Sequence, residues 1–274
     1  MLKTRFLVAA LLLPIGLAAI YFGGFPYYAL VSFFLVIAAY EYVRMFRAGG
    51  LRPAGVLVMG GVLLFVFGRI FYDFDNAPLM LTAVLLASIV YHLFAFERGC
   101  QQSGTDYGVT LAGILYLGWI GAYLISLRKL PLGEWWMLLV LPSIWMVDSG
   151  AYLVGSRFGR HKLSPRLSPR KTWEGYFGGV VAGILGGALL AAVWQSLVAP
   201  GSLITLERGA VLGLALGLLT IFGDLGESMF KRQFGLKDSG NILPGHGGAF
   251  DRIDSWLWGG VIGYYVIVFF THYT

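Results

Sequence analysis

Long apolar stretches alternate with short polar segments along the whole chain. Stretches near the ~20 residues that a helix needs to cross a bilayer lie at 6–23, 26–46, 54–72, 77–96, 108–127, 134–155, 175–198, 209–230 and 251–271. The pattern predicts an all-α integral membrane protein with about nine transmembrane helices. The first stretch follows two basic residues, as a signal peptide does, but it is long, lacks a clean small-x-small cleavage site and leads directly into further spans. We therefore predict that it is a retained helix.

The composition agrees with this fold class. Only 12% of the residues are charged, and the mean hydropathy of +0.75 excludes a soluble core. No polar block is long enough to form a separate soluble domain. We expect N-terminal spans in 1–130 and a catalytic region in 131–274, together forming one integrated membrane domain. Cys100 is the single cysteine, which excludes an internal disulfide and a cysteine-based zinc site.

The basic residues are distributed asymmetrically. If the N-terminus lies in the cytoplasm, the inside segments collect 16 of the 20 lysines and arginines, while Arg69, Arg128, Lys129 and Arg208 remain near the outer side. Because cytoplasmic loops carry an excess of basic residues, we predict a cytoplasmic N-terminus and an external C-terminus. The predicted location is the inner (plasma) membrane, in multi-pass form, with the polar loops that follow the sixth and eighth spans facing the cytoplasm.

Two of the predicted spans carry glycine ridges. Glycines recur every four residues at 175, 179, 183 and 187, and again at 209, 213 and 217. This spacing places them on one helix face and lets another backbone approach closely. Helix packing within the chain explains the ridges, and a homodimer would use them equally well. In either case the cytoplasmic ends of these spans would be held rigidly.

Five acidic residues lie at the predicted membrane surface or inside it. Asp148, Asp224 and Glu227 interrupt apolar spans, where a carboxylate usually faces a polar cavity or a partner. Asp251 and Asp254 open the ninth span at i, i+3 spacing and so share one helix face. Salt bridges, helix capping and interhelical hydrogen bonds are the structural alternative. As hard oxygen ligands they would suit Mg²⁺, with a second cation left open.

Two polar segments carry cations beside turns. The segment 157–174 is rich in basic residues, and Ser168, Arg170 and Lys171 come directly before a helix, where backbone amides favour anions. The segment 228–254 adds Lys231, Arg232, Lys237, His246, Gly247, Gly248 and Arg252. Retention of a positively charged loop in the cytoplasm is the alternative. The residue types favour phosphate binding and predict metal-dependent phosphoryl or nucleotidyl transfer.

The C-terminal half resembles the phosphatidate cytidylyltransferases, also called CDP-diacylglycerol synthases. The resemblance runs from Ser228 to Asp254 almost position for position, with Ala249 where a larger aliphatic residue is usual. Family-like motifs also lie upstream, at Asp148–Tyr152, Ser168–Gly175 and Gly223–Ser228. The first ~130 residues are similar only as apolar spans of membrane length.

The resemblance implies Mg²⁺-dependent formation of CDP-diacylglycerol and pyrophosphate from CTP and phosphatidate at the bilayer, with no nucleic-acid partner. It implies catalytic roles for Asp148, Lys171, Asp224 and Asp251. Asp224 and Asp251 are the first choices for metal ligands, followed by Glu227 and Asp254. The phosphate groups would be held by residues of both polar segments: Ser168, Arg170, Lys171, Lys231, Arg232, Lys237, His246, Gly247, Gly248 and Arg252.

Two other functions share some of these features. A lipid or polyprenol kinase, or another membrane phosphotransferase, would need the same metal and cations. An ion-coupled transporter would also place acids and glycines within its spans, and it predicts broken helices near the midplane together with an inverted repeat. The chain contains no convincing repeat.

Overall fold

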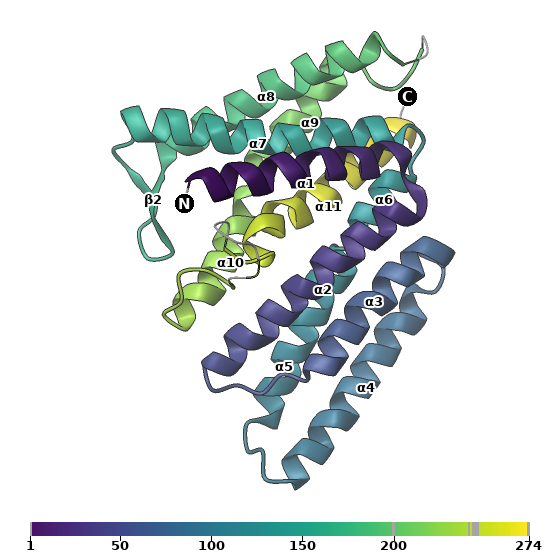
Figure 1. Ribbon diagram of the computed structural model, residues 1–274, viewed down its shortest axis with the longest axis vertical. Helices are drawn as coiled ribbons and strands as arrows, with labels where there is room; N and C mark the ends of the chain where they lie inside the picture. The colour runs from purple at the N-terminus through teal and green to yellow at the C-terminus, as the bar shows by residue number, and fades with distance from the viewer. Residues whose placement is uncertain (1, 199–200, 241, 243–246, 273–274) are drawn as a thin grey trace. The chain divides into compact units, whose positions relative to one another are not determined.

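The computed structural model describes residues 2–198, 201–240, 242 and 247–272. The described part of the chain is mainly helical (Figure 1). Its helices are α1 (Leu2–Phe22), α2 (Gly24–Ala48), α3 (Gly55–Tyr72), α4 (Ala77–Glu97), α5 (Ser103–Gly113), η1 (Ile114–Ile120), α6 (Tyr123–Lys129), α7 (Gly133–Phe158), α8 (Trp173–Gln195), α9 (Leu206–Leu219), α10 (Ile221–Gln233) and α11 (Phe250–His272). One short hairpin, β1 (Lys162–Ser164) and β2 (Ser168–Thr172), adds strand to the predicted all-α fold.

The predicted membrane spans are confirmed by length and composition. Within the described residues, eight segments are long and apolar enough to cross a bilayer, and they coincide with eight of the nine predicted spans. The remaining prediction, 6–23, falls on α1, in which Leu12–Phe22 forms a shorter apolar stretch. The orientation of the termini stays a prediction.

Two of the spans are interrupted, which the sequence pattern did not indicate. The span Ser103–Lys129 contains the π-helix η1, and the span Leu206–Gln233 breaks at Thr220, between α9 and α10. The Thr220 hydroxyl donates to the Leu216 carbonyl oxygen at 2.8 Å, a bond of the kind that bends helices. The break begins a new helix at Ile221 and places Asp224 in its first turn, where the helix dipole favours a negative charge.

The chain forms two compact units. Unit 1 comprises Met1–Ser126 and Phe230–Ile253, and unit 2 comprises Leu127–Met229 and Asp254–Thr274. Unit 1 therefore joins the first helices to the polar segment near the C-terminus. Its helices α2, α3, α4 and α5 lie side by side (Figure 1), around buried apolar side chains such as Leu35, Val58 and Leu117. The predicted integration of the chain into one membrane domain stays a prediction.

Unit 2 is built on close contacts between helix backbones. Helix α8 packs along α7 and α9 (Figure 1). A Cβ atom at Gly183 would lie 2.6 Å from the Gly213 carbonyl oxygen, and one at Gly187 would meet Gly209. The two glycine ridges therefore face each other within the chain, as the spacing predicted. The homodimer stays a prediction.

Candidate active site

An ion pair joins Lys171 and Asp224 in unit 2. The Lys171 ammonium lies 2.7 Å from Asp224 Oδ2, and the Ser228 hydroxyl donates to Asp224 Oδ1 at 3.3 Å. Asp148, an exposed residue of α7, interacts electrostatically with both Lys171 and Asp224. The structure thus gathers three of the four predicted catalytic residues from α7, the end of β2 and α10.

The hairpin before α8 holds Lys171 in place. Its strands pair antiparallel, with Ser164 opposite Ser168 and Lys162 opposite Thr172. The Thr172 hydroxyl caps α8 by accepting the Gly175 backbone N–H at 3.2 Å. Lys171 is therefore the last residue before a helix N-cap, as the sequence predicted, and its backbone is set by the sheet on one side and the cap on the other.

Glu174 binds the backbone just before β1. Its carboxylate accepts the backbone N–H groups of Arg160 and His161 at 3.1 and 3.2 Å, and it lies 2.6 Å from His161 Nδ1. The hairpin is thus tied to the first turn of α8 through Glu174. Of the other predicted phosphate ligands here, Arg170 is exposed on β2 and Ser168 is partly buried.

Two further predicted acids of unit 2 lie in a helix interface. Glu227 is 1% exposed and Asp254 is 8% exposed. A Cβ atom at Gly223 would lie 2.6 Å from the Asp254 carbonyl oxygen, so α10 and α11 touch through their backbones at this point. Glu227 and Asp254 are therefore packed between helices, whereas Asp148 and Asp224 are accessible.

Asp251, in unit 1, is surrounded by donors. Its Oδ1 lies 2.6 Å from the Lys231 ammonium. Its Oδ2 accepts the backbone N–H groups of Ser239 and Gly248 and the Ser239 hydroxyl, each at 2.9 Å. This carboxylate links the end of α10, the polar loop and the start of α11. It organises the described part of the polar segment 228–254.

The remaining predicted phosphate ligands of this segment differ in exposure. Lys231 is buried, while Arg232, Lys237 and Arg252 are exposed. The Arg232 guanidinium donates to the Leu236 carbonyl oxygen at 2.9 Å. Gly247 has a positive φ of 83°, which only glycine adopts readily. Gly248 packs directly on the Ser239 side chain. His246 lies outside the described residues.

The sequence analysis missed Glu41 and Ser239. Glu41, on α2, is buried and accepts the Phe250 backbone N–H at 2.9 Å and the Ser239 hydroxyl at 3.2 Å. A signal for Glu41 was present, because an acidic residue inside an apolar span is the criterion that selected Asp148. Ser239 gave no comparable signal, since a serine in a polar loop is ordinary.

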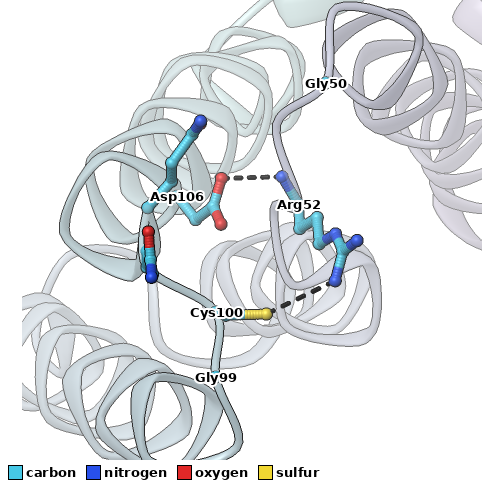
Figure 2. A pocket seen from close by; sticks show the side chains of 7 residues that line it. Gly50, Arg52, Gly99, Cys100 and Asp106 are labelled. Atoms are coloured by element: carbon cyan, nitrogen blue, oxygen red, sulfur yellow. Dashed lines mark hydrogen bonds between the residues drawn. The ribbon is translucent and has the colours of Figure 1, made fainter.

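A cavity of about 250 Å³ lies elsewhere in unit 1, between the α2–α3 and α4–α5 connections. Figure 2 shows its polar lining, in which the Arg52 backbone N–H donates to Asp106 at 2.6 Å and the Arg52 guanidinium lies 3.6 Å from Cys100 Sγ. None of the predicted site residues lines it. We therefore assign the cavity no part in the site.

Known proteins match the chain over nearly its whole length. The model of the cytidylyltransferase family matches residues 3–270. The chain belongs to this family. It is similar to the phosphatidate cytidylyltransferases of Pseudomonas aeruginosa (36% identity, covering 93% of each chain), Bacillus subtilis (34%, covering 98% of this chain and 99% of the relative) and Synechocystis (32%, covering 96% of each). The resemblance inferred from the C-terminal motifs is confirmed, and it extends into the N-terminal spans.

Two carboxylates of this cytidylyltransferase-family chain are of the chemical type that binds a hard cation. Asp148 and Asp224 are accessible carboxylates that interact with one ammonium group, and Mg²⁺ prefers such oxygen ligands. Among the described residues, no three acidic, histidine or cysteine side chains form a group that would hold a metal ion. The predicted metal site and its ligands therefore stay predictions.

Proposed function

We propose that the chain transfers the cytidylyl group of CTP to phosphatidate, forming CDP-diacylglycerol and pyrophosphate. The observation that carries the proposal is the near full-length similarity to relatives named phosphatidate cytidylyltransferase, which covers 93–98% of this chain in the three reported. The two lysine–carboxylate pairs, Lys171 with Asp224 and Lys231 with Asp251, support it, because they supply the cations and oxygen ligands that such a reaction needs.

In the proposed reaction an anionic phosphate oxygen of phosphatidate attacks the α-phosphorus of CTP. A new P–O bond forms, the bond between the α-phosphorus and the bridging oxygen breaks, and pyrophosphate leaves with that oxygen. No general base is needed, because the attacking oxygen is already anionic. The task of the protein is to position the two phosphates and to neutralise their charge.

The lysines are suited to this task. Lys171 is partly exposed, with 27% of its side chain accessible, and its backbone is held by the hairpin and the helix cap. An ammonium group on a flexible stem exchanges one anion for another readily. We propose that Lys171 transfers its contact from Asp224 to a substrate phosphate. The exposed cations Arg170, Arg232, Lys237 and Arg252 would attract the phosphates to the surface.

We also propose that the reaction depends on Mg²⁺. Asp224 and Asp251 are the first choices for its ligands, with Asp148, Glu227 and Asp254 as further candidates. When bound, the ion would stabilise the charge that develops on the phosphates and on the leaving pyrophosphate. Of the two first choices, Asp224 is the more accessible, with 37% of its side chain exposed against 10% for Asp251.

The activity test uses purified protein in detergent with each of the four nucleoside triphosphates. We expect pyrophosphate release from CTP only when phosphatidate and Mg²⁺ are both present, with an equal amount of CDP-lipid. A kinase would leave a nucleoside diphosphate and no pyrophosphate. Either that product or the absence of lipid-dependent cleavage by folded protein would overturn the proposal.

The break at Thr220, like the intramembrane acids and glycines, also fits the transporter alternative. Its local effect is to begin α10 one turn before Asp224 and so to place a carboxylate at a helix N-terminus. A transporter would move an ion or solute without consuming CTP. The activity test therefore separates the two functions.

We further propose that the site faces the cytoplasm, on the basis of the asymmetric basic residues. Single cysteines in a Cys100→Ser background would replace Arg166 in the hairpin, Asp238 in the polar loop or Asp75 in the α3–α4 connection, all exposed. We expect a membrane-impermeant thiol reagent to label intact cells only at position 75. Labelling at 166 and 238 from outside would reverse the orientation. Labelling at only one of them would separate the two polar loops.

A further inference from the structure

Glu41 is a buried acid in a helix of membrane length. It lies on α2, in a segment of mean hydropathy 1.6, and only 1% of the residue is exposed. A carboxylate in such a place is costly unless it has a specific partner. The role of Glu41 therefore follows from the residues that it contacts.

The partners of Glu41 come from both ends of the polar loop. Its Oε2 accepts the backbone N–H of Phe250, the first residue of α11, at 2.9 Å, and the Ser239 hydroxyl at 3.2 Å. The same hydroxyl lies 2.9 Å from Asp251 Oδ2. A hydroxyl has a single proton to donate, so Ser239 shares it between the two carboxylates. Glu41 is thereby linked to Asp251 through one side chain.

The loop is shaped to fit this carboxylate. Cβ atoms at Gly240 and Gly248 would collide with Glu41, and a Cβ at Gly248 would also collide with the Ser239 hydroxyl. Glycine at these two positions therefore leaves room for Glu41 on both sides of the loop. This gives Gly248 a packing role in addition to the predicted approach to phosphate.

Stability alone does not account for a glutamate at this position. Glu41 Oε1 is buried and has no hydrogen-bond partner in the part of the chain that the structure describes. An apolar side chain would avoid that cost. A buried polar atom left in this state points to a role that an apolar residue would not fulfil.

We propose that Glu41 is a positioning residue of the active site. It holds Ser239 and the start of α11 so that the Asp251 carboxylate faces Lys231 and the loop amides. The proposal rests on the proposed function for its kinetic consequences, but its structural consequence, order in the loop, is independent of any activity. The N-terminal half would then take a direct part in building the site.

Four variants test this. Glu41→Ala removes the acceptor, and Glu41→Gln keeps an acceptor oxygen while removing the charge. Ser239→Ala removes the link to Asp251. Asp106→Ala is the matched control, because Asp106 is also a buried acid of unit 1 that accepts a distant backbone N–H, that of Arg52, and it lies outside the assigned site.

The measurements are hydrogen exchange of peptides covering 237–253, the thermal midpoint, and kcat and KM for CTP and phosphatidate. For Glu41→Ala we expect faster exchange in this loop and a kcat lower by roughly a hundredfold, the loss typical of a displaced catalytic group. Glu41→Gln should stay within about threefold of the original protein, because it still accepts both hydrogen bonds. Asp106→Ala should leave the exchange of the loop unchanged.

A double-mutant cycle adds a second criterion. Ser239→Ala should lower kcat about tenfold, and its effect should largely disappear in the Glu41→Ala background, because both changes break one chain of hydrogen bonds. Additive effects would show that the two residues act separately and would overturn the proposal. If Glu41→Ala does not fold, Ser239→Ala alone tests the link: faster exchange in 237–253 with the lower kcat is expected, and unchanged exchange would overturn the proposal.

Two other outcomes would also overturn it. If Glu41→Gln loses as much activity as Glu41→Ala while the loop keeps its exchange protection, Glu41 acts through its charge and not by positioning. If Asp106→Ala lowers the thermal midpoint and kcat as much as Glu41→Ala does, the role is general packing. A protein that is inactive with CTP and phosphatidate but shows the expected exchange pattern would refute the proposed function and retain the positioning role.

Discussion

Two aspartates that the sequence presents alike have opposite surroundings in the two units. Asp224, in unit 2, contacts one lysine and one serine and keeps 37% of its side chain exposed. Asp251, in unit 1, accepts hydrogen bonds from Lys231, Ser239 and Gly248, and 10% of its side chain is exposed. The first has room for a new partner. The Asp251 oxygens already accept several hydrogen bonds, and the conformation of the loop depends on these bonds.

The lysines that pair with these aspartates differ in the same direction. The side chain of Lys171 is 27% exposed, whereas that of Lys231 is 11% exposed. A partly exposed ion pair contributes little to stability, and a buried one is strongly destabilising when one partner is removed. We infer that Lys171 and Asp224 form an exchangeable pair in unit 2, while Lys231 and Asp251 support the polar loop in unit 1. The following predictions test this division.

The largest effect on turnover is expected for Asp224→Asn. The substitution keeps the size of the side chain and removes the charge that a hard cation needs, so kcat should fall on the order of a thousandfold. The thermal midpoint should change little, because the lost ion pair is partly exposed. Turnover and the midpoint are measured on the same preparation, with Mg²⁺ varied.

Asp73→Asn is the control for this variant. Asp73 is an exposed residue with a positive φ of 51°, a conformation that asparagine tolerates, so activity should stay within about twofold. If Asp224→Asn kept near-normal turnover at limiting Mg²⁺, Asp224 would no longer be a candidate metal ligand.

Asp251→Asn should combine a smaller kinetic loss with a structural one. The amide oxygen still accepts from the loop, but the buried Lys231 loses its counter-charge. We expect kcat to fall about a hundredfold and exchange in 237–253 to rise. Hydrogen exchange is measured in Asp251→Asn and Asp224→Asn together, which separates a supporting role from an exchangeable one. Equal exchange in the two variants would remove the distinction between an exchangeable and a supporting aspartate.

The sequence predicted the features that depend on local pattern. The apolar stretches of membrane length form helices, and the glycines spaced four residues apart bring Gly183 into contact with Gly213. The position of Lys171 before a helix and the start of the last span near Asp251 follow from local turn and capping chemistry, and both are confirmed.

The features that the sequence did not predict depend on distant partners. Glu41 and Phe250 are 209 residues apart, and no local period relates them. The hydrogen bonds of Asp251 likewise come from Ser239 and Gly248, and the sequence alone does not predict where the loop places these two residues. The break at Thr220 was not predicted, because no proline marks it and the predicted span 209–230 runs through it. The metal ligands remain predictions, because they too would come from residues distant in the sequence.

The glycine contacts between α8 and α9 allow a further test. It asks how much the rigid packing of unit 2 contributes to the function of Lys171 and Asp224. Gly213→Ala would place a methyl group against the Gly183 carbonyl oxygen, a backbone atom that has no room to move aside. We expect a loss of about 1–3 kcal/mol in the free energy of unfolding, as for other overpacked sites. Activity measured below the unfolding transition should fall less than tenfold, because no ligand contact changes.

Gly60→Ala is the matched control, since a Cβ atom at that helical position meets nothing within 4 Å. Its unfolding in detergent should stay close to that of the original protein. If both substitutions destabilised the protein equally, loss of glycine itself would be the cause, and the close contact between α8 and α9 would not be a determinant of stability.

The smallest effect is expected for Thr172→Val, which tests whether the helix cap positions Lys171. Valine keeps the shape of the side chain, which is 5% exposed, but it cannot accept the Gly175 N–H, and loss of such a cap costs about 1 kcal/mol. Because Lys171 is proposed to contact a substrate phosphate, a cap that positions it should raise KM for CTP about threefold to fivefold and leave kcat nearly unchanged. Thr172→Ser, which keeps the hydroxyl, should restore the original KM. A fall in kcat with unchanged KM, or failure of serine to restore binding, would mean that the hairpin holds Lys171 without the cap.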